Sequence, residues 1–273
     1  MTDARRTLAP FGRRLAAVAT NDRVGAYRLI TASDPDGPPG PRPGQFYMLA
    51  AEDGWGAGES ERPYLPRAFS FARAREGSLS FLLEDVGPGT HRLAQLHEGD
   101  GLWLTGPLGI GFDIQPGAIL VGGGIGAAPL LCLQDELGPE IPLLLGFRSA
   151  AHAEAATLFA GEPQVATDDG STGRHALVTE LLREQLDLST VNSQPSTTVY
   201  ACGPPPMLEA VRALAAEREV AAQLALESGM ACGFGACFGC VVPTKNGYVR
   251  LCVDGPVLDA AELQTALAPG AGH

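Results

Sequence analysis

The sequence has no hydrophobic run of transmembrane length, and no apolar segment of signal-peptide length follows its arginine-bearing start at residues 1–14. Positive charge is also scarce: 19 basic residues stand against 31 acidic ones, for a formal net charge of -12. A chain this acidic repels nucleic acid and anionic lipid. We therefore expect a cytoplasmic protein without a nucleic-acid or membrane partner, whose N-terminal residues form a frayed, solvated tail.

Charged residues make up only 18% of the chain and hydrophobic residues 45%, which is ordinary for a globular enzyme with real hydrophobic cores. At about 100–200 residues per domain, 273 residues predict two domains and a small third module. The pattern of apolar residues changes near residues 113 and 220. We therefore expect domains at 1–113 and 114–220, followed by a module at 221–273.

The first region holds short segments of strand character separated by turn-rich stretches, a spacing that predicts an all-β barrel or sandwich. Two long connections, 33–44 and 52–63, lack any pattern that would pack, so we expect both to be mobile surface loops. The expected strands are 25–31, 45–51, 67–72, 79–84 and 102–105.

Strand and helix patterns alternate through the second region, which predicts a parallel sheet covered by helices. One of these helices is expected to bury Leu177, Leu181 and Leu182 on one side. The expected strands are 118–122, 141–147 and 197–201, and the expected helices are 127–137, 176–186 and 204–219.

Four of the six cysteines lie beyond residue 220. Cys232, Cys237 and Cys240 form a C-x4-C-x2-C pattern, and Cys252 follows after eleven intervening residues, as in plant-type [2Fe–2S] proteins. The glycines between them let the backbone approach the bridging sulfides. A structural zinc site is the main alternative, although zinc ligands usually come in pairs with a longer spacer. A reducing compartment disfavours disulfides, and Cys132 is expected to be a small buried apolar residue.

A glycine-rich turn follows the strand expected at 118–122 and opens a helix, which is the context in which such a turn binds a pyrophosphate. A second glycine-bearing turn follows the strand expected at 197–201. Because ligands bind at the carboxyl ends of parallel strands, the two turns predict a dinucleotide cleft. A tight strand–helix turn without a ligand is the alternative. The turn residues are Gly122, Gly123, Gly124, Ile125 and Gly126, and Cys202, Gly203 and Pro204.

The choice between NAD and NADP depends on a few charged side chains. Asp168 or Asp169 can bond ribose hydroxyls, as acidic residues do in NAD sites, although an ordinary Asx turn explains this segment equally well. Arg148 favours the other cofactor, since an arginine after this strand can meet a 2′-phosphate. The sequence therefore favours NAD over NADP.

Arg67, Ala68, Phe69 and Ser70 form a short motif in the β-rich region. A guanidinium can hold a pyrophosphate, while the aromatic ring and the hydroxyl meet the face and the polar edge of a flavin. An ordinary strand with alternating faces is the alternative.

Taken together, these motifs resemble those of the ferredoxin–NADP reductase superfamily. The segments 230–240 and 250–256 are similar to one branch, the electron-transfer subunits of class 1B dihydroorotate dehydrogenase. The resemblance runs from Pro43 to Pro256, with a phenylalanine at position 69 where the wider superfamily has tyrosine.

The resemblance implies an FAD-binding antiparallel β-barrel, a Rossmann-like parallel-sheet domain for NAD, and a small C-terminal [2Fe–2S] module. It implies cluster ligation by Cys232, Cys237, Cys240 and Cys252, and nicotinamide contacts from the two glycine-bearing turns. The implied FAD contacts are Arg67, Ala68, Phe69, Ser70, Leu82, Leu83, Glu84, Gly89 and Thr90.

The branch implies a subunit that carries electrons from a dihydroorotate-oxidising FMN partner through the cluster and FAD to NAD⁺ in pyrimidine biosynthesis, as a heterotetramer of two copies of each chain. No motif for a catalytic base or nucleophile occurs, and we expect no catalytic residue here. His91, His97, His152 and His175 are expected at the surface or at helix ends. The alternatives are a reductase subunit of a hydrogenase or of a ferredoxin:NADP transhydrogenase, or a non-redox, zinc-bound docking protein.

Overall fold

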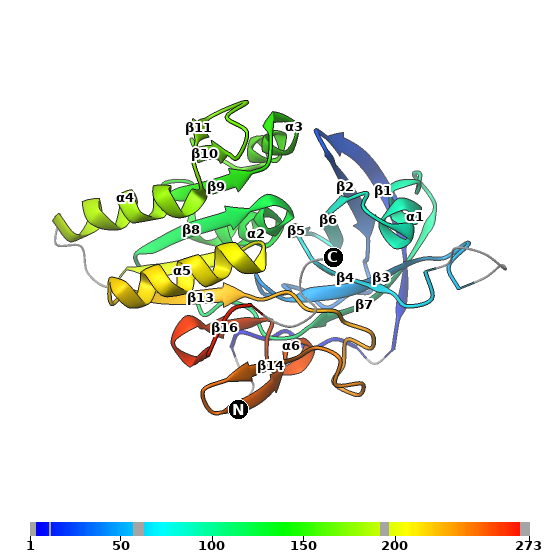
Figure 1. Cartoon of the computed structure of the whole chain (residues 1–273). Helices are drawn as coiled ribbons and strands as arrows, with labels where there is room; N and C mark the ends of the chain where they lie inside the picture. Colours follow the sequence, from blue (N-terminus) through cyan, green and yellow to red (C-terminus); the bar gives the residue numbers. More distant parts are fainter. Residues whose placement is uncertain (1–3, 11, 57–62, 192–196, 268–273) are drawn as a thin grey trace.

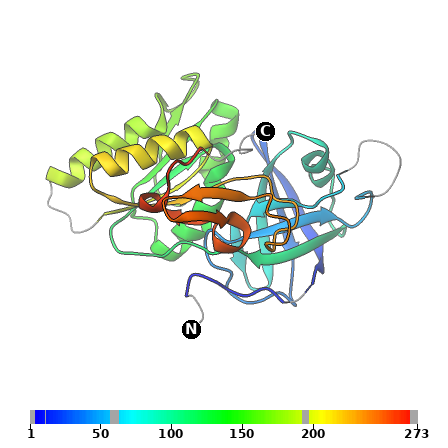
Figure 2. The same cartoon turned by 60° about the horizontal axis from the view of Figure 1, so that its bottom comes forward.

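The computed structural model describes residues 4–10, 12–56, 63–191 and 197–267. Its two largest parts are a seven-stranded antiparallel sheet and a seven-stranded, mostly parallel sheet, which lie side by side (Figure 1). A short hairpin near the C-terminal end lies across the junction between them (Figure 2). The antiparallel and α/β parts confirm the predicted fold class.

The antiparallel sheet has the strand order β4-β3-β7-β1-β2-β6-β5. Alternating side chains from one face of this sheet, such as Ile30, Leu49 and Phe81, are buried in one core. All five predicted strands are present, whereas β1 and β5 were not predicted. The sheet consists of β1 (Arg14–Val24), β2 (Tyr27–Ser33), β3 (Phe46–Ala51), β4 (Arg67–Ser70), β5 (Arg73–Arg75), β6 (Ser78–Glu84) and β7 (Gly101–Leu108), and helix α1 (Pro88–Ala94) follows β6.

The second sheet has the order β11-β10-β9-β8-β12-β13-β16, in which only β16 runs antiparallel to its neighbour. Its strands are β8 (Ala118–Gly123), β9 (Leu143–Phe147), β10 (Gln164–Thr167), β11 (Arg174–His175), β12 (Thr198–Cys202), β13 (Ala221–Ala225) and β16 (Val257–Asp259). The connections include α2 (Ala128–Leu137), α3 (Ala150–Ala153), α4 (Val178–Val191) and α5 (Pro205–Glu217).

Helices cover both faces of the parallel sheet. Ile119 and Val121 of β8 pack in one cluster with α4 and α5, whereas Leu120 of the same strand packs with α2 on the other face. Leu181 and Leu182 are buried as predicted, but the prediction for Leu177 was wrong. Leu177 is 59% exposed because it precedes α4, where its N–H donates to the Glu180 side chain.

The C-terminal segment is built onto the parallel sheet. Strand β16 pairs with β13, so the sheet continues beyond residue 220. Between these two strands lie the cysteine loop (residues 232–240), the hairpin of β14 (Val241–Thr244) and β15 (Gly247–Arg250), and α6 (Leu251–Asp254). Cys240, Leu251 and Cys252 belong to the same buried cluster as α4 and α5.

The N-terminal segment is held in place through Arg6 and Thr7, which corrects the prediction of a frayed tail. Arg6 donates hydrogen bonds to the carbonyls of Gly109 and Val253, at 3.1 and 2.8 Å. The buried side chain of Gln45 accepts from the Thr7 N–H and donates to the Thr7 and Gly109 carbonyls. This segment therefore ties the antiparallel sheet to α6.

The predicted loop at 33–44 is also anchored. Asp34 is buried and forms an ion pair with Arg14, with Nη2 2.6 Å from Oδ2. Of the other predicted loop, 52–63, residues 57–62 lie outside the described part. Trp55 is half-buried and packs against the core of the antiparallel sheet.

Candidate functional site

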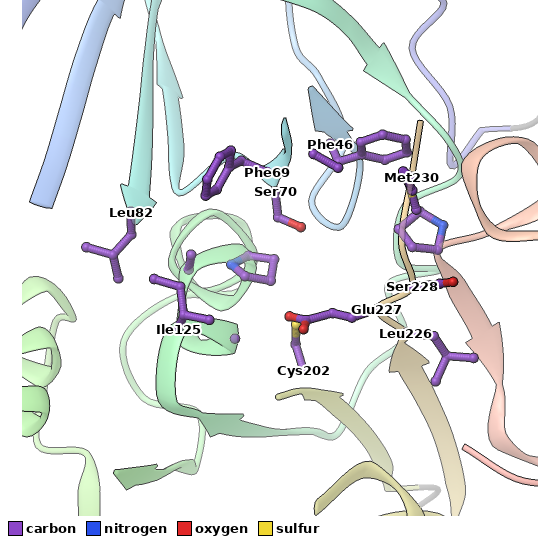
Figure 3. A pocket seen from close by; sticks show the side chains of 15 residues that line it. Phe46, Phe69, Ser70, Leu82, Ile125, Cys202, Leu226, Glu227, Ser228 and Met230 are labelled. Atoms are coloured by element: carbon purple, nitrogen blue, oxygen red, sulfur yellow. The ribbon is translucent and has the colours of Figure 1, made fainter. Parts of the chain in front are cut away.

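Two adjoining cavities lie at the junction of the two sheets. The smaller has a volume of about 260 Å³ and the larger about 650 Å³. Phe69, Ile125 and Glu227 line both of them. Figure 3 shows Phe69 and Ser70 facing the smaller cavity from the antiparallel sheet, with Cys202 and Glu227 on the opposite side.

The antiparallel sheet contributes most of the predicted flavin motif. Ala68, Phe69 and Ser70 of β4 and Leu82 of β6 line the smaller cavity, while Glu84 and Thr90 line the larger one. Ser70 and its neighbours are available because β4 is an edge strand, which pairs with β3 alone among the described strands. Leu83 instead points into the sheet core and is fully buried.

Arg67 lies directly over Gly89 at the start of α1. A Cβ on Gly89 would come within 2.6 Å of the Arg67 Nε, so a larger residue here would displace the Arg67 side chain. The Thr90 hydroxyl accepts from the N–H groups of Val86 and Gly87, at 2.9 Å each, which fixes the turn before the helix. A guanidinium beside this fixed turn suits an anionic group.

The two glycine-bearing turns meet, as predicted, at the carboxyl edge of the parallel sheet. A Cβ on Gly126 would lie 2.5 Å from the Gly203 nitrogen, and one on Gly123 would lie 2.4 Å from the Met207 sulfur. Of the residues predicted here, Gly122 and Gly203 line neither cavity and serve close packing. Those that line a cavity are Gly123, Gly124, Ile125, Gly126, Cys202 and Pro204.

Arg148 and Asp168 both line the larger cavity. Arg148 donates to Glu84 of the antiparallel sheet, so the pair spans the junction. His152 lies 2.8 Å from Arg148 and 3.2 Å from Glu84. His152 lies in the last turn of α3, which confirms its prediction as a surface or helix-end residue, and its side chain is 16% exposed beside Arg148 and Glu84 at the junction. Asp169 instead forms an Asx turn with Ser171, the alternative that the sequence left open.

Glu227 was missed by the sequence analysis. It follows β13 by two residues and lines both cavities. The Glu227 side chain is exposed where it faces the open cavities. Protein atoms nevertheless surround its carboxyl group closely, and this burial raises the pKa of that group. Burial also raises the pKa of Cys202, with a smaller contribution from the Glu227 charge. The rule that ligands meet the carboxyl ends of strands identifies Glu227 once β13 is recognised.

The four C-terminal cysteines gather in two pairs. The Cys252 N–H donates to the Cys240 sulfur at 3.5 Å, and both side chains are buried. Cys232 contacts Cys237, which is the exposed member of the group. Burial acts to raise the pKa of Cys232, but N–H groups of the loop backbone face its sulfur and bring the pKa to about 6. Among the described residues, no three His, Cys, Asp or Glu side chains converge on one point.

This donor set fits a [2Fe–2S] cluster. Four sulfur atoms in two pairs provide two thiolates for each of two irons, and clusters of this type take four cysteine ligands. Gly233 and Gly235 have φ of +77° and +86°, conformations that glycine adopts without strain and that turn the loop backbone toward the sulfurs. Met230, two residues before Cys232, lines the smaller cavity, so the cysteine loop and the cavity are neighbours.

No helix in the described ranges combines the length and hydrophobicity that crossing a lipid bilayer requires.

The two sheets, the junction cavities and the cysteine loop define a reductase of the ferredoxin-reductase type. Among solved structures, the chain is similar to an NADH-dependent reduced ferredoxin–NADP oxidoreductase, with a TM-score of 0.75 and 25% identity, over 94% of this chain and 92% of the other. A ferredoxin reductase in carbazole 1,9a-dioxygenase shares the fold, with a TM-score of 0.61 and 22% identity over 77% of this chain and 66% of the other.

Proteins related in sequence show to which family of these reductases the chain belongs. Residues 227–264 match the model of the iron-sulfur cluster binding domain of dihydroorotate dehydrogenase B. Proteins named "Dihydroorotate dehydrogenase B (NAD(+)), electron transfer subunit" match from Caldanaerobacter subterraneus subsp. tengcongensis (37% identity, 82% of this chain, 87% of the relative) and Bacillus caldolyticus (38%, 81% and 86%). The chain belongs to this family of electron transfer subunits, which confirms the resemblance found in its motifs.

Proposed function

We propose that this chain carries electrons from a dihydroorotate-oxidising, FMN-containing partner to NAD⁺ through a [2Fe–2S] cluster and FAD, in pyrimidine biosynthesis. When bound, the cluster supplies one-electron steps and FAD couples them to the two-electron chemistry of the nicotinamide. The observation that carries the proposal is the position of the cysteine loop, which adjoins the cavity between the two sheets through Met230.

The smaller cavity and the start of α1 are the proposed FAD site. Phe69 offers an aromatic face and Ser70 a hydroxyl to the ring system, while Arg67 and the turn before α1 receive the pyrophosphate. Phe69 lacks a hydroxyl, so the polar side chains available to the ring edge are those of Ser70, Glu227 and Ser228, which line this cavity. The remaining predicted contacts around this site are Ala68, Leu82, Glu84, Gly89 and Thr90.

The larger cavity is the proposed NAD site. Its floor is the turn Gly123–Ile125, whose N–H groups suit a pyrophosphate, and the proline-rich start of α5. Asp168 lines this cavity and provides a carboxylate for ribose hydroxyls. Arg148 is engaged by Glu84, which supports NAD rather than NADP, because a 2′-phosphate would compete with that ion pair.

The proposed cluster ligands are Cys232, Cys237, Cys240 and Cys252. We propose the parts 1–113 for FAD, 114–220 for NAD and 221–273 for the cluster, with the third part built onto the second through β16. The proposed assembly is a cytoplasmic heterotetramer of two copies of each chain. The exposed Cys237 marks the side of the cluster that faces the FMN partner.

A second candidate is a reductase subunit of another electron-transfer complex, in which ferredoxin replaces dihydroorotate as the electron donor. The similarity to the NADH-dependent ferredoxin–NADP oxidoreductase, which covers nearly the whole chain, favours this candidate over other functions. The two candidates share the cofactors and differ in the partner.

The test uses the full chain purified anaerobically, alone and co-expressed with the dihydroorotate-oxidising chain of its native source. We expect visible absorption of flavin and iron–sulfur, one FAD and two irons per chain, and dihydroorotate-dependent reduction of NAD⁺ by the complex. The variant Cys240→Ser should retain FAD and lose this activity. Colourless protein overturns the proposal, and NAD(P)⁺ reduction driven only by reduced ferredoxin selects the second candidate.

A further inference from the structure

Arg250 connects the end of β15 to the cysteine loop. Its Nη1 donates a hydrogen bond of 3.2 Å to the Gly235 carbonyl, and its guanidinium carbon lies 5.4 Å from the centre of the Phe238 ring. Asp254 holds Arg250 from the other side, since its Oδ2 accepts from the Arg250 backbone N–H at 2.9 Å and from Nε at 3.5 Å. A cation is thereby fixed against the loop that carries three of the four cysteines.

The carbonyl that Arg250 binds belongs to the peptide group between Gly235 and Ala236. The N–H of this same peptide group faces the Cys232 sulfur. The N–H of Gly235 itself faces the Cys252 sulfur. A cation on the carbonyl side of a peptide polarises it and strengthens the N–H as a donor. Arg250 therefore acts on a segment whose N–H groups face sulfurs from both ends of the cysteine pattern.

We propose that Arg250 is a positioning residue that raises the reduction potential of the [2Fe–2S] cluster by holding the Gly235–Ala236 peptide with its N–H toward Cys232. The inference rests on the proposed function, because it requires a cluster held by the four cysteines. One-electron reduction adds negative charge at the sulfurs. Hydrogen-bond donors and a nearby cation stabilise the reduced form more than the oxidised form, which raises the potential.

Asp254 lowers the reduction potential of the cluster in this arrangement, which is the opposite of the effect of Arg250. Its carboxylate offsets part of the guanidinium charge, and the two side chains are 35% and 41% exposed. Water therefore screens both charges in part, so that each single change has a moderate effect. Removing the Arg250 charge should lower the potential, whereas removing the Asp254 charge should raise it. A general loosening of the loop would not produce shifts of opposite sign.

The test is a redox titration of the cluster in the holoprotein, followed by EPR. For Arg250→Gln, we expect the ratio of reduced to oxidised cluster at a fixed potential to fall about tenfold, which is about 59 mV for a one-electron couple. Arg250→Lys keeps the positive charge but lacks the planar guanidinium group. We therefore expect the ratio to fall less in Arg250→Lys than in Arg250→Gln. Asp254→Asn should shift the ratio upward. The matched control is Lys245→Gln, which removes a cation in the β14–β15 turn and should leave the potential unchanged.

The outcomes separate this inference from the proposed function. Wild-type protein without iron or FAD overturns both. Wild-type protein with both cofactors, together with equal potentials or shifts of the same sign in Arg250→Gln and Asp254→Asn, overturns the role of Arg250 alone. If Arg250→Gln assembles no cluster, Arg250→Lys and Asp254→Asn decide, and potentials equal to wild type in both overturn the inference.

Discussion

At the scale of single residues, Glu209 shows how one carboxylate joins the C-terminal segment to the parallel sheet. From α5, it accepts hydrogen bonds from Arg212, from the Thr265 hydroxyl at 3.0 Å and from the Ala266 N–H at 2.6 Å. These donors, of which Arg212 is the strongest, lower the pKa of Glu209 to about 2. The charged form is therefore stabilised in the folded protein.

We expect Glu209→Gln to destabilise the protein at pH 7 but not in acid. Because the pKa of the folded form is depressed, the stabilisation is present above the unfolded value of 4.5 and is lost as pH falls toward about 2. After allowance for solvent screening, the effect at pH 7 is about 1 kcal/mol. Urea unfolding at pH 7, 5 and 3 measures it, with Glu140→Gln, at an exposed carboxylate, as the control. A loss that is equal at all three pH values would contradict the expected linkage.

Residues whose position depends on a single local segment could be predicted from the sequence. The spacing of Cys232, Cys237 and Cys240 depends on one loop, and Gly123 lies in a turn between adjacent elements. Glu227 could not be found in this way, because its position depends on β13 (AAQLA), a short segment without β-branched residues. The helix-end position of His152 was predicted, but its contact with Glu84 across the junction could not be, since the two residues are distant in the sequence.

At the scale of elements, the cysteine loop is shaped by the antiparallel sheet beneath it. A Cβ on Gly233 would lie 2.7 Å from the Met48 Cγ of β3 and 3.1 Å from the Leu108 Cδ1 of β7. The φ of Gly233 is +77°, which adds backbone strain for any other residue. Close packing on β3 and β7 therefore requires glycine at this point of the loop.

We expect Gly233→Ala to lower the iron content per chain at least severalfold while FAD content stays near that of wild type, because the loop must move away from β3. The matched control is Gly239→Ala in the same loop. Its Cβ would meet nothing nearer than the Cys237 sulfur at 3.6 Å, an ordinary contact. Iron and FAD analysis of the purified variants measures both. Equal iron contents for the two variants would show that packing on β3 is unimportant.

Elements whose pairing is local or strongly patterned could be predicted, and others could not. The predicted strand at 118–122 has a continuous apolar run and was found. Strand β1 was not predicted because only Ala16 and Val18 of its eleven residues are buried, so its sequence lacks a clear alternation. Strand β16 pairs with β13 more than thirty residues away. Such non-local pairing leaves no local signal, which is why the C-terminal segment appeared separate from the parallel sheet.

At the scale of the whole molecule, the arrangement orders the three proposed cofactor sites. The larger cavity, the smaller cavity and the cysteine loop adjoin one another in that sequence, through Phe69 and Ile125 and then through Met230. The order matches a path from nicotinamide to flavin to cluster. The cysteine loop is the last of the three sites in this order. Its surface carries the exposed Cys237 and two exposed aromatic side chains, Phe234 and Phe238.

We expect this surface to bind the FMN partner. Phe234 is 65% exposed, and aromatic side chains in that position typically dominate the binding energy of an interface. We expect Phe234→Ser to weaken binding of the partner about tenfold, equivalent to about 1.4 kcal/mol, while NADH-dependent reduction of a small dye stays unchanged. The control is Leu188→Ser, a similarly exposed apolar residue on helix α4 of the parallel sheet. Equal affinities of the two variants, measured by titration of the purified partner, would place the partner elsewhere on the molecule.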